Sequence, residues 1–177
     1  AKVCKKHFPK HKTVFLSPCD YKKIEASKTK CIDYVIDYEQ LHDLINKNKL
    51  NKIKVPKGEL FDKFYNDYTK IYPISGGLTK TAKVKDILKK DEIKIIDGAK
   101  KVMKFLDNPD PKVNFLDILF CDGGCINGPR TSKKLTISEK RKKVINYLKK
   151  SEKENIPEER KGIYEKAKGL KFTKKSF

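Results

Sequence analysis

Short apolar runs and apolar residues at helical spacing alternate along this chain. Thr13 to Leu16 is a β-branched and aromatic run, which predicts a strand that ends at Ser17-Pro18-Cys19. Cys31 to Tyr38 alternates acidic and apolar residues and predicts a second strand. From Glu39 the apolar residues recur at helical spacing, and Asp37 is placed to cap that helix. Strands and helices in such short succession indicate βαβ units and a largely parallel sheet.

The alternation continues through the middle of the chain. We expect a helix around Glu59 to Tyr68, and another from Thr79 or Lys80 to about Lys90 after a Gly-Gly turn. Ile93 to Ile96 predicts a strand, and Val113 to Phe120 predicts a buried one. Between these strands lies a helix with an apolar stripe, interpreted as core, which is formed by Ala99, Val102, Met103 and Leu106.

The chain becomes highly charged after Pro129. Ser138 can cap a helix that runs to Lys150, and Pro157 can open a further helix that Gly169 ends. We therefore expect two parts. Residues 1–135 would form an α/β fold with a parallel or mixed sheet and flanking helices, and residues 136–177 a charged helical C-terminal segment.

Composition narrows the class of protein. The 177 residues amount to about one domain. The formal net charge of +20 is of the kind found in nucleic-acid-binding proteins. However, Arg is favoured for base edges and phosphates, and three of the 43 basic residues are Arg. The 40 lysines interleave with acids along the whole chain, so we expect solvated faces, and a lysine-rich nucleic-acid-binding domain is the less favoured alternative.

The chain shows no apolar run of about 18 residues and no secretory signal, so we expect a cytoplasmic protein that does not enter a membrane. It begins with Ala1 rather than Met, and we expect a fragment or an excised domain.

Cysteines carry the most distinctive chemistry. Of the five, Cys4 and Cys31 have no supporting context and are interpreted as ordinary small apolar side chains. Cys121 and Cys125 lie four residues apart, divided by Gly123-Gly124, in a loop that follows a predicted strand. Glycines let backbone N–H groups approach closely, which favours a metal or cluster site. The alternative is a tight turn with two incidental cysteines.

Cys19 also lies in a loop that follows a predicted strand. Loops at the carboxyl ends of parallel strands converge in an open α/β sheet, so Cys19, Cys121 and Cys125 can meet. Three thiolates suit a [4Fe–4S] cluster that lacks one ligand. The rival is a Cys3His zinc site, with the fourth ligand drawn from His7, His11 and His42, although none has metal-ligand spacing to a cysteine.

These motifs resemble signatures of the iron-only, or [FeFe], hydrogenase large subunit. Residues 17–25 (SPCDYKKIE) resemble the second signature, P-C-x-x-K-K-x-E. Residues 121–129 (CDGGCINGP) resemble the third, C-x-G-G-C-x-x-G. Between them, residues 72–82 (YPISGGLTKTA) are similar to the family's Gly-Gly helix start. The resemblance covers roughly residues 1 to 150 and implies an iron-hydrogenase large-subunit-like fold that is incomplete in this chain.

The resemblance also implies a role for each site residue. In that family a [4Fe–4S] cluster and a two-iron subsite with CO and CN ligands form the H-cluster, which interconverts protons, electrons and H2. Cys19 and Cys121 would be cubane ligands, and Cys125 the cysteine that bridges the two parts. Lys22 matches the lysine that hydrogen-bonds a cyanide, and Glu25 a glutamate of possible proton-relay function. Alternatively, Lys22 and Lys23 are surface lysines and Glu25 is their ion-pair partner.

The chain also departs from the family. The first signature, T-S-C-C-P, is absent, so the fourth cubane ligand is expected upstream of Ala1 and this chain alone is expected to be inactive. Leu119-Phe120 replaces a methionine before the third signature, and Asn127-Gly128-Pro129 replaces its Gly-rich ending. These features resemble divergent branches, which makes an iron–sulfur sensory or electron-transfer module the alternative to an enzyme. The implied partner is a ferredoxin-like electron carrier or further iron–sulfur domains.

Overall fold

The structure is a computed structural model that describes residues 1–54, 67–154, 156–158 and 169–170. The chain divides into two compact units, one formed by residues 1–65 and 156–177 and the other by residues 66–155. We describe each unit by itself.

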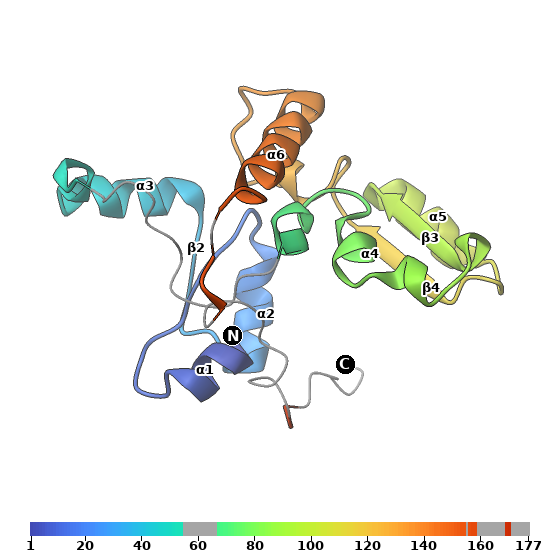
Figure 1. Cartoon of the computed structure of the whole chain (residues 1–177), viewed down its shortest axis with the longest axis horizontal. Coiled ribbons are helices and arrows are strands. Elements are labelled where there is room, and N and C mark those ends of the chain that lie inside the picture. Colours follow the sequence, from blue (N-terminus) through green and yellow to red (C-terminus); the bar gives the residue numbers. More distant parts are fainter. Residues whose placement is uncertain (55–66, 155, 159–168, 171–177) are drawn as a thin grey trace. The chain divides into compact units, whose positions relative to one another are not determined.

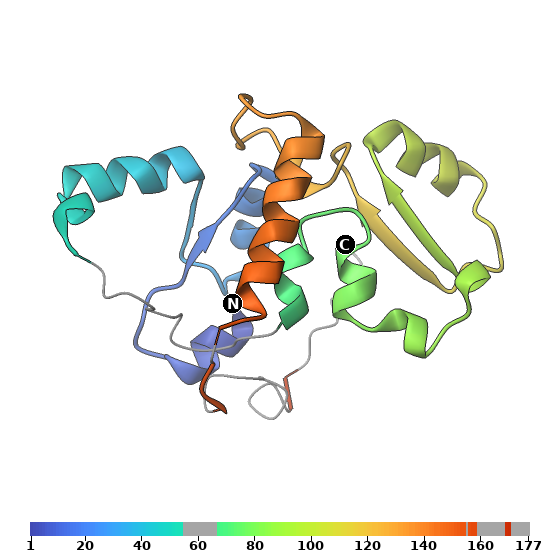
Figure 2. The same cartoon turned by 45° about the horizontal axis from the view of Figure 1, so that its top comes forward.

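The first unit is built on a short parallel β-α-β arrangement (Figures 1 and 2). After helix α1 (Lys2–His7), strand β1 (Val14–Leu16) pairs in parallel with β2 (Tyr34–Ile36). Helix α2 (Tyr21–Thr29) connects the two strands. Helix α3 (Tyr38–Lys47) and a short 3-10 turn (Leu50–Lys52) follow β2.

Polar contacts fix the ends of these elements. The Asp37 carboxylate accepts a hydrogen bond from the Gln40 N–H at 2.9 Å, and the Gln40 side chain accepts one from the Asp37 N–H at 3.0 Å. This capping box starts α3 where the sequence predicts. Near the start of both strands, the Asp33 carboxylate accepts from the Lys5 ammonium and from the Thr13 N–H, both at 2.6 Å. These bonds hold the pKa of Asp33 well below its usual range.

The second unit contains a second parallel pair of strands (Figure 1). Strand β3 (Ile93–Asp97) leads into helix α5 (Ala99–Asp107), which returns the chain to β4 (Phe115–Leu119) beside β3. Helix α4 (Gly77–Thr81) precedes β3, and helix α6 (Ile137–Ser151) follows β4. Short 3-10 helices are η2 (Asp67–Ile71), η3 (Val84–Asp86), η4 (Lys90–Glu92) and η5 (Cys125–Asn127).

The buried hydrophobic side chains of the described residues lie mainly in this second unit. They are Ile71, Ile74, Val84, Ile96 and Val102, with Ile156 in the first unit. Helix α6 packs on η2 and η5, so the segment that carries the Cys121 loop is held between β4 and α6.

The predicted α/β fold with parallel strands and flanking helices is confirmed, while several details differ. Residues 21–29, directly after the Cys19 loop, form helix α2, which the sequence pattern does not predict. The helix expected to run to Lys90 ends at Thr81, because Lys83 adopts a left-handed conformation (φ 50°) and Val84 turns into the core. The second strand covers Tyr34–Ile36 instead of the whole of residues 31–38, since Tyr38 already begins α3.

Two expectations about burial and capping are also corrected. Met103 and Leu106 are 55% and 50% exposed, so half of the predicted apolar stripe of α5 lies outside the core. Thr136, and not Ser138, caps α6 through a capping box with Glu139, and hydrogen bonds from Thr136 lower the pKa of Glu139. The helix expected around residues 59–68 and the one opened by Pro157 lie largely outside the described residues. The proposed boundary between residues 135 and 136 stays a prediction.

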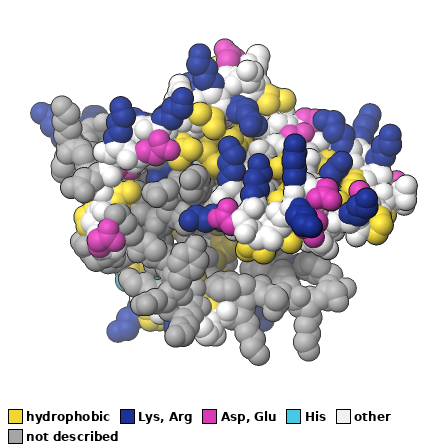
Figure 3. All heavy atoms as spheres, turned by 45° about the vertical axis from the view of Figure 1, so that its right-hand side comes forward, with side chains coloured by type: hydrophobic (Ala, Val, Ile, Leu, Met, Phe, Trp, Pro, Cys, Tyr) yellow, Lys and Arg dark blue, Asp and Glu magenta, His cyan; other side chains and the backbone are white. Residues whose placement is uncertain are grey.

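On the face shown in Figure 3, basic side chains are numerous, and acidic and apolar side chains lie among them. The interpretation of the lysines as solvated stays a prediction. Among the described residues, no helix has the length and apolar character needed to cross a membrane.

Candidate metal centre

Cys19 lies at the point where β1 passes into α2. Ser17, two residues before Cys19, is 1% exposed, and its N–H donates to the Ile36 carbonyl at 2.8 Å. The Ser17 hydroxyl donates to the Cys19 carbonyl at 2.8 Å and accepts from the Cys19 N–H at 3.2 Å. Ser17 therefore ties the half-buried Cys19 to the carboxyl end of the small sheet, a role that the sequence pattern did not reveal.

Lys22 and Glu25 lie three residues apart in the first half of α2. Their side chains form an ion pair, and each is 35% exposed. The Lys22 ammonium also lies 5.8 Å from the centroid of the Phe15 ring, within the range of a cation–π contact. Lys23 pairs with Asp20 at 3.1 Å instead. In this structure Glu25 thus orients Lys22, and the cluster roles of both residues stay predictions.

Cys121 and Cys125 begin and end a tight loop after β4. The Gly124 N–H donates to the Cys121 carbonyl at 2.9 Å, and the Gly128 N–H to the Cys125 carbonyl at 3.0 Å. Both thiols are half-buried and neither forms a disulfide. The loop thus carries two reduced cysteines on one short, internally hydrogen-bonded backbone segment.

The two Gly-Gly turns of the chain pack against each other. Gly124 forms an isolated antiparallel bridge with Ile74, and the Ile126 N–H donates to the Pro73 carbonyl at 3.3 Å. Gly124 has φ +98°, and a Cβ there would lie 2.5 Å from the Pro73 oxygen. Gly123 has φ +77°, and a Cβ there would lie 2.3 Å from Ile137 Cγ2. Both glycines are therefore required by backbone conformation and close packing, and their predicted contact with a cofactor stays a prediction.

A buried carboxylate, that of Asp117, stabilises the contact between the two Gly-Gly turns. Asp117, in the middle of β4, is 1% exposed, and its Oδ2 accepts from the Thr79 N–H at 2.9 Å and from the Thr79 hydroxyl at 2.7 Å. Thr79 lies in the first turn of α4, directly after Gly76-Gly77. The bonds thus join the strand that carries the cysteine loop to the helix after the other Gly-Gly turn. In the sequence, the only indication of this hydrogen bonding is that Asp117 is an acid within the apolar run of residues 113–120.

Two lysines hold the segment after Cys125. Lys140 is 8% exposed, and its ammonium donates to Asn127 Oδ1 at 3.3 Å and to the Thr131 hydroxyl at 3.4 Å. The Lys133 ammonium donates to the Gly128 carbonyl at 3.3 Å. These contacts place positive charge against the loop, where it would also offset the negative charge of a thiolate-bound cluster. Neither lysine was singled out by sequence reasoning.

Replacing Lys140 with methionine should loosen the segment after Cys125, because two partly buried hydrogen bonds are lost while the apolar stem is retained. We expect alkylation of the Cys125 thiol to become about fivefold faster, the equivalent of roughly 1 kcal/mol of hydrogen bonding. Peptide mapping after timed iodoacetamide treatment measures this rate. Lys142→Met, an exposed lysine of the same helix, is the matched control, and equal rates in the two variants would contradict the anchoring role.

The three predicted ligands are divided between the units. Cys19 belongs to the first unit, and Cys121 and Cys125 to the second. Within the ranges that the structure describes, no three side chains of the metal-binding types gather into a ready site. The shared cluster of the three thiols therefore stays a prediction, as does the zinc alternative.

Comparison with known families identifies the family to which this chain belongs. Residues 1–129 match the family model of the iron-only hydrogenase large subunit, C-terminal domain. This match covers well over half of the 177 residues, and the chain belongs to that family of oxidoreductases. No curated protein matched the sequence.

Proposed function

We propose that this chain provides part of an H-cluster catalytic domain, which interconverts protons, electrons and H2 in the complete hydrogenase. The observation that carries the proposal is the position of both cysteine signatures. Cys19 follows the carboxyl end of β1, and Cys121 follows the carboxyl end of β4, each in a parallel strand pair. The carboxyl ends of parallel strands are where α/β proteins hold ligands.

The donor set fits an iron–sulfur cluster. Cys19, Cys121 and Cys125 form no disulfide and are half-buried, and thiolates are the usual ligands of such clusters. In this proposal Cys19 and Cys121 would be ligands of a [4Fe–4S] cubane, and Cys125 would be the ligand that the cubane shares with the two-iron subsite. A cubane takes four thiolates, so another cysteine or an exogenous thiol has to complete it. When bound, this assembly supplies the redox chemistry.

The neighbouring side chains of α2 would act on protons and charge. An ammonium is a strong hydrogen-bond donor to an anionic ligand, which suits Lys22 to a cyanide of the subsite. Glu25, already paired with the Lys22 ammonium, would hold that lysine in place and could accept and release a proton at its carboxylate. Electrons would come from a ferredoxin-like carrier or from further iron–sulfur domains, in the cytoplasm.

A second function has some support from the sequence. Leu119-Phe120 and Asn127-Gly128-Pro129 depart from the family's third signature. Phe120, directly before Cys121, is 72% exposed in this structure. A module that holds the same cluster for sensing or electron transfer, without efficient H2 turnover, is therefore the alternative.

Anaerobic reconstitution with iron, sulfide and excess thiol tests the ligand assignment. We expect the chain to bind a labile cluster, measured as iron content and charge-transfer absorption, and to show no H2 evolution alone. Cys19→Ser and Cys121→Ser should each lower bound iron several-fold, because a serine hydroxyl is a poor cluster ligand. Cys4→Ser and Cys31→Ser are matched controls, and the assignment is wrong if these two lose iron to the same extent.

An assay of the complete hydrogenase that contains this chain would distinguish the enzyme from the sensory or electron-transfer module. Hydrogen evolution with a reduced dye, abolished by Cys125→Ser, would support the enzyme. A stable cluster with reversible redox behaviour and no hydrogen evolution would favour the sensory or electron-transfer module.

A further inference from the structure

One edge of β3 is open for pairing within the described part of the chain. β3 pairs with β4 on its other side. The Gly98 N–H donates to the Leu119 carbonyl at 3.0 Å, and the Glu92 carbonyl accepts from the Asn114 N–H at 2.9 Å. Because backbone groups alternate sides along a parallel strand, Lys94 and Ile96 also face β4. The N–H and carbonyl of Ile95 and the N–H of Asp97 therefore point to the open edge.

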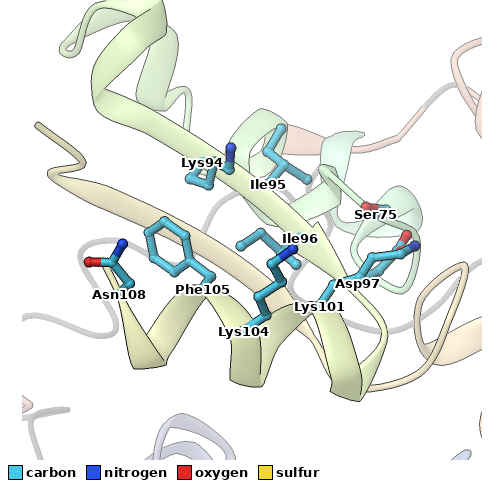
Figure 4. A pocket seen from close by; sticks show the side chains of 9 residues that line it. All are labelled: Ser75, Lys94, Ile95, Ile96, Asp97, Lys101, Lys104, Phe105 and Asn108. Carbon is cyan, nitrogen blue, oxygen red and sulfur yellow. The ribbon is translucent and has the colours of Figure 1, made fainter. Parts of the chain in front are cut away.

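A groove of about 620 Å³ lies on the side of this edge that α5 covers (Figure 4). Ile96 and Phe105 form its apolar floor, and three lysines surround it: Lys94 from β3, and Lys101 and Lys104 from α5. Lys101 is partly balanced by Asp97 at 3.6 Å and Asp122 at 3.8 Å. The groove thus combines a small apolar surface with an excess of positive charge.

A second groove, of about 740 Å³, lies on the other side of the edge. Its apolar lining comes from Ile87, Leu88, Ile93 and Ile95, and its charged lining from Lys85, Asp86, Lys89 and Lys90. Ile87 is 80% exposed and Ile95 is 42% exposed. Ile95 borders both grooves, so the grooves flank the same stretch of open backbone.

We propose that the open edge of β3 binds an extended acidic segment of a partner protein, which pairs with Ile95 and Asp97 as an additional strand. Successive side chains of such a strand point to opposite faces. Acidic side chains would enter the lysine-rich groove beside α5, and apolar side chains the groove beside η3 and η4. Backbone pairing would supply affinity and the two grooves specificity, as in other cases of strand addition.

Charge argues for an acidic partner and against a second copy of this chain. Each copy has a net charge of +20, and pairing of two β3 edges would bring both sets of lysines together. Lysines on an edge strand disfavour self-pairing for this reason. A segment rich in Asp or Glu meets attraction at the same positions.

Amide hydrogen exchange and fluorescence titration test the proposal on the intact chain. The probes are nine-residue peptides in which Glu alternates with Val, Ile or Phe. On binding, the N–H groups of Ile95 and Asp97 should exchange at least about tenfold more slowly. The N–H groups of Lys94 and Ile96, already bonded to β4, should change little.

Two matched pairs separate strand pairing from charge attraction. Peptides N-methylated on the face that meets β3 should bind at least about tenfold more weakly than unmodified ones, because their backbone donors are lost. Lys94→Glu/Lys104→Glu should weaken binding by a similar factor, whereas Lys142→Glu/Lys149→Glu on α6 should not.

Three results would overturn the proposal. One is the absence of Ile95 protection with every peptide at millimolar concentration. Another is equal binding of the N-methylated peptides or of the Lys94→Glu/Lys104→Glu variant. The third is protection of Ile95 that rises with protein concentration without peptide, which would identify a second copy as the occupant.

Discussion

Replacing Asp117 with alanine is expected to destabilise the protein by about 3 kcal/mol, because two buried donors of Thr79 lose their acceptor. The carboxylate is 1% exposed and accepts both the Thr79 N–H and the Thr79 hydroxyl. The change also leaves a small cavity in the middle of β4. Urea unfolding followed by circular dichroism measures the loss, and the thermal midpoint should fall by about 10 °C.

Three further variants and one control variant extend this test. Asp117→Asn keeps an oxygen acceptor and should lose less stability than Asp117→Ala. Thr79→Val removes the hydroxyl, and the double variant should cost less than the sum of the single ones, since the hydroxyl and its acceptor then disappear together. Asp107→Ala, an exposed acid at the end of α5, is the control. Equal losses for Asp107→Ala and Asp117→Ala would rule out the buried pair as the cause.

Replacing Gly124 with alanine is expected to displace the cysteine loop. The new Cβ would lie 2.5 Å from the Pro73 carbonyl oxygen and 3.0 Å from Leu119 Cδ1, and the backbone at φ +98° is strained for any residue with a side chain. The Pro73 oxygen belongs to the backbone, so it cannot move aside cheaply. We expect a loss of about 3 kcal/mol and alkylation of Cys121 and Cys125 that is at least several-fold faster.

Gly169 offers a matched control for this variant. It has φ +79°, and among the described residues outside its chain neighbours no atom lies within 4 Å of the position of its Cβ. Gly169→Ala therefore introduces the backbone strain without the collision and should cost about 1 kcal/mol. If both variants lose the same stability and Gly124→Ala leaves thiol reactivity unchanged, the contact between the two Gly-Gly turns does not hold the loop.

Much of the fold could be predicted from local pattern. Val14–Leu16, Ile93–Asp97 and Phe115–Leu119 are strands because short runs rich in β-branched and aromatic residues favour extended backbone. The start of α3 was predictable because Asp37 and Gln40 form a capping box from residues three apart. Parallel pairing followed from the alternation of strands and helices.

Other elements escaped local reasoning for identifiable reasons. Residues 21–29 contain few apolar residues, so the helix that carries Lys22 and Glu25 gives a weak periodic signal. The break after α4 depends on Val84 finding a place in the core, which is a tertiary event. Met103 and Leu106 have the spacing of a buried stripe, yet burial also requires something to cover them.

Some residues of the candidate site could likewise be predicted from the sequence, and others could not. The cysteines and glycines of the two loops could be predicted, because thiols and glycines at fixed spacing have a chemical meaning that the order of residues preserves. Ser17, Asp117 and Lys140 could not, since each is an ordinary polar residue until its burial and its partners are known.

By itself, the sequence determined the fold class, the two cysteine loops and the family, because these depend on residue types and their spacing along the chain. The tertiary structure alone decided which polar groups are buried and that the two Gly-Gly turns support each other. It also decided that, among the described residues, no strand pairs with the edge of β3 that lies between two grooves. Those properties arise from contacts between residues distant in the sequence, such as Thr79 with Asp117 and Lys140 with Asn127. Their energies depend on exclusion from water, which no local pattern records.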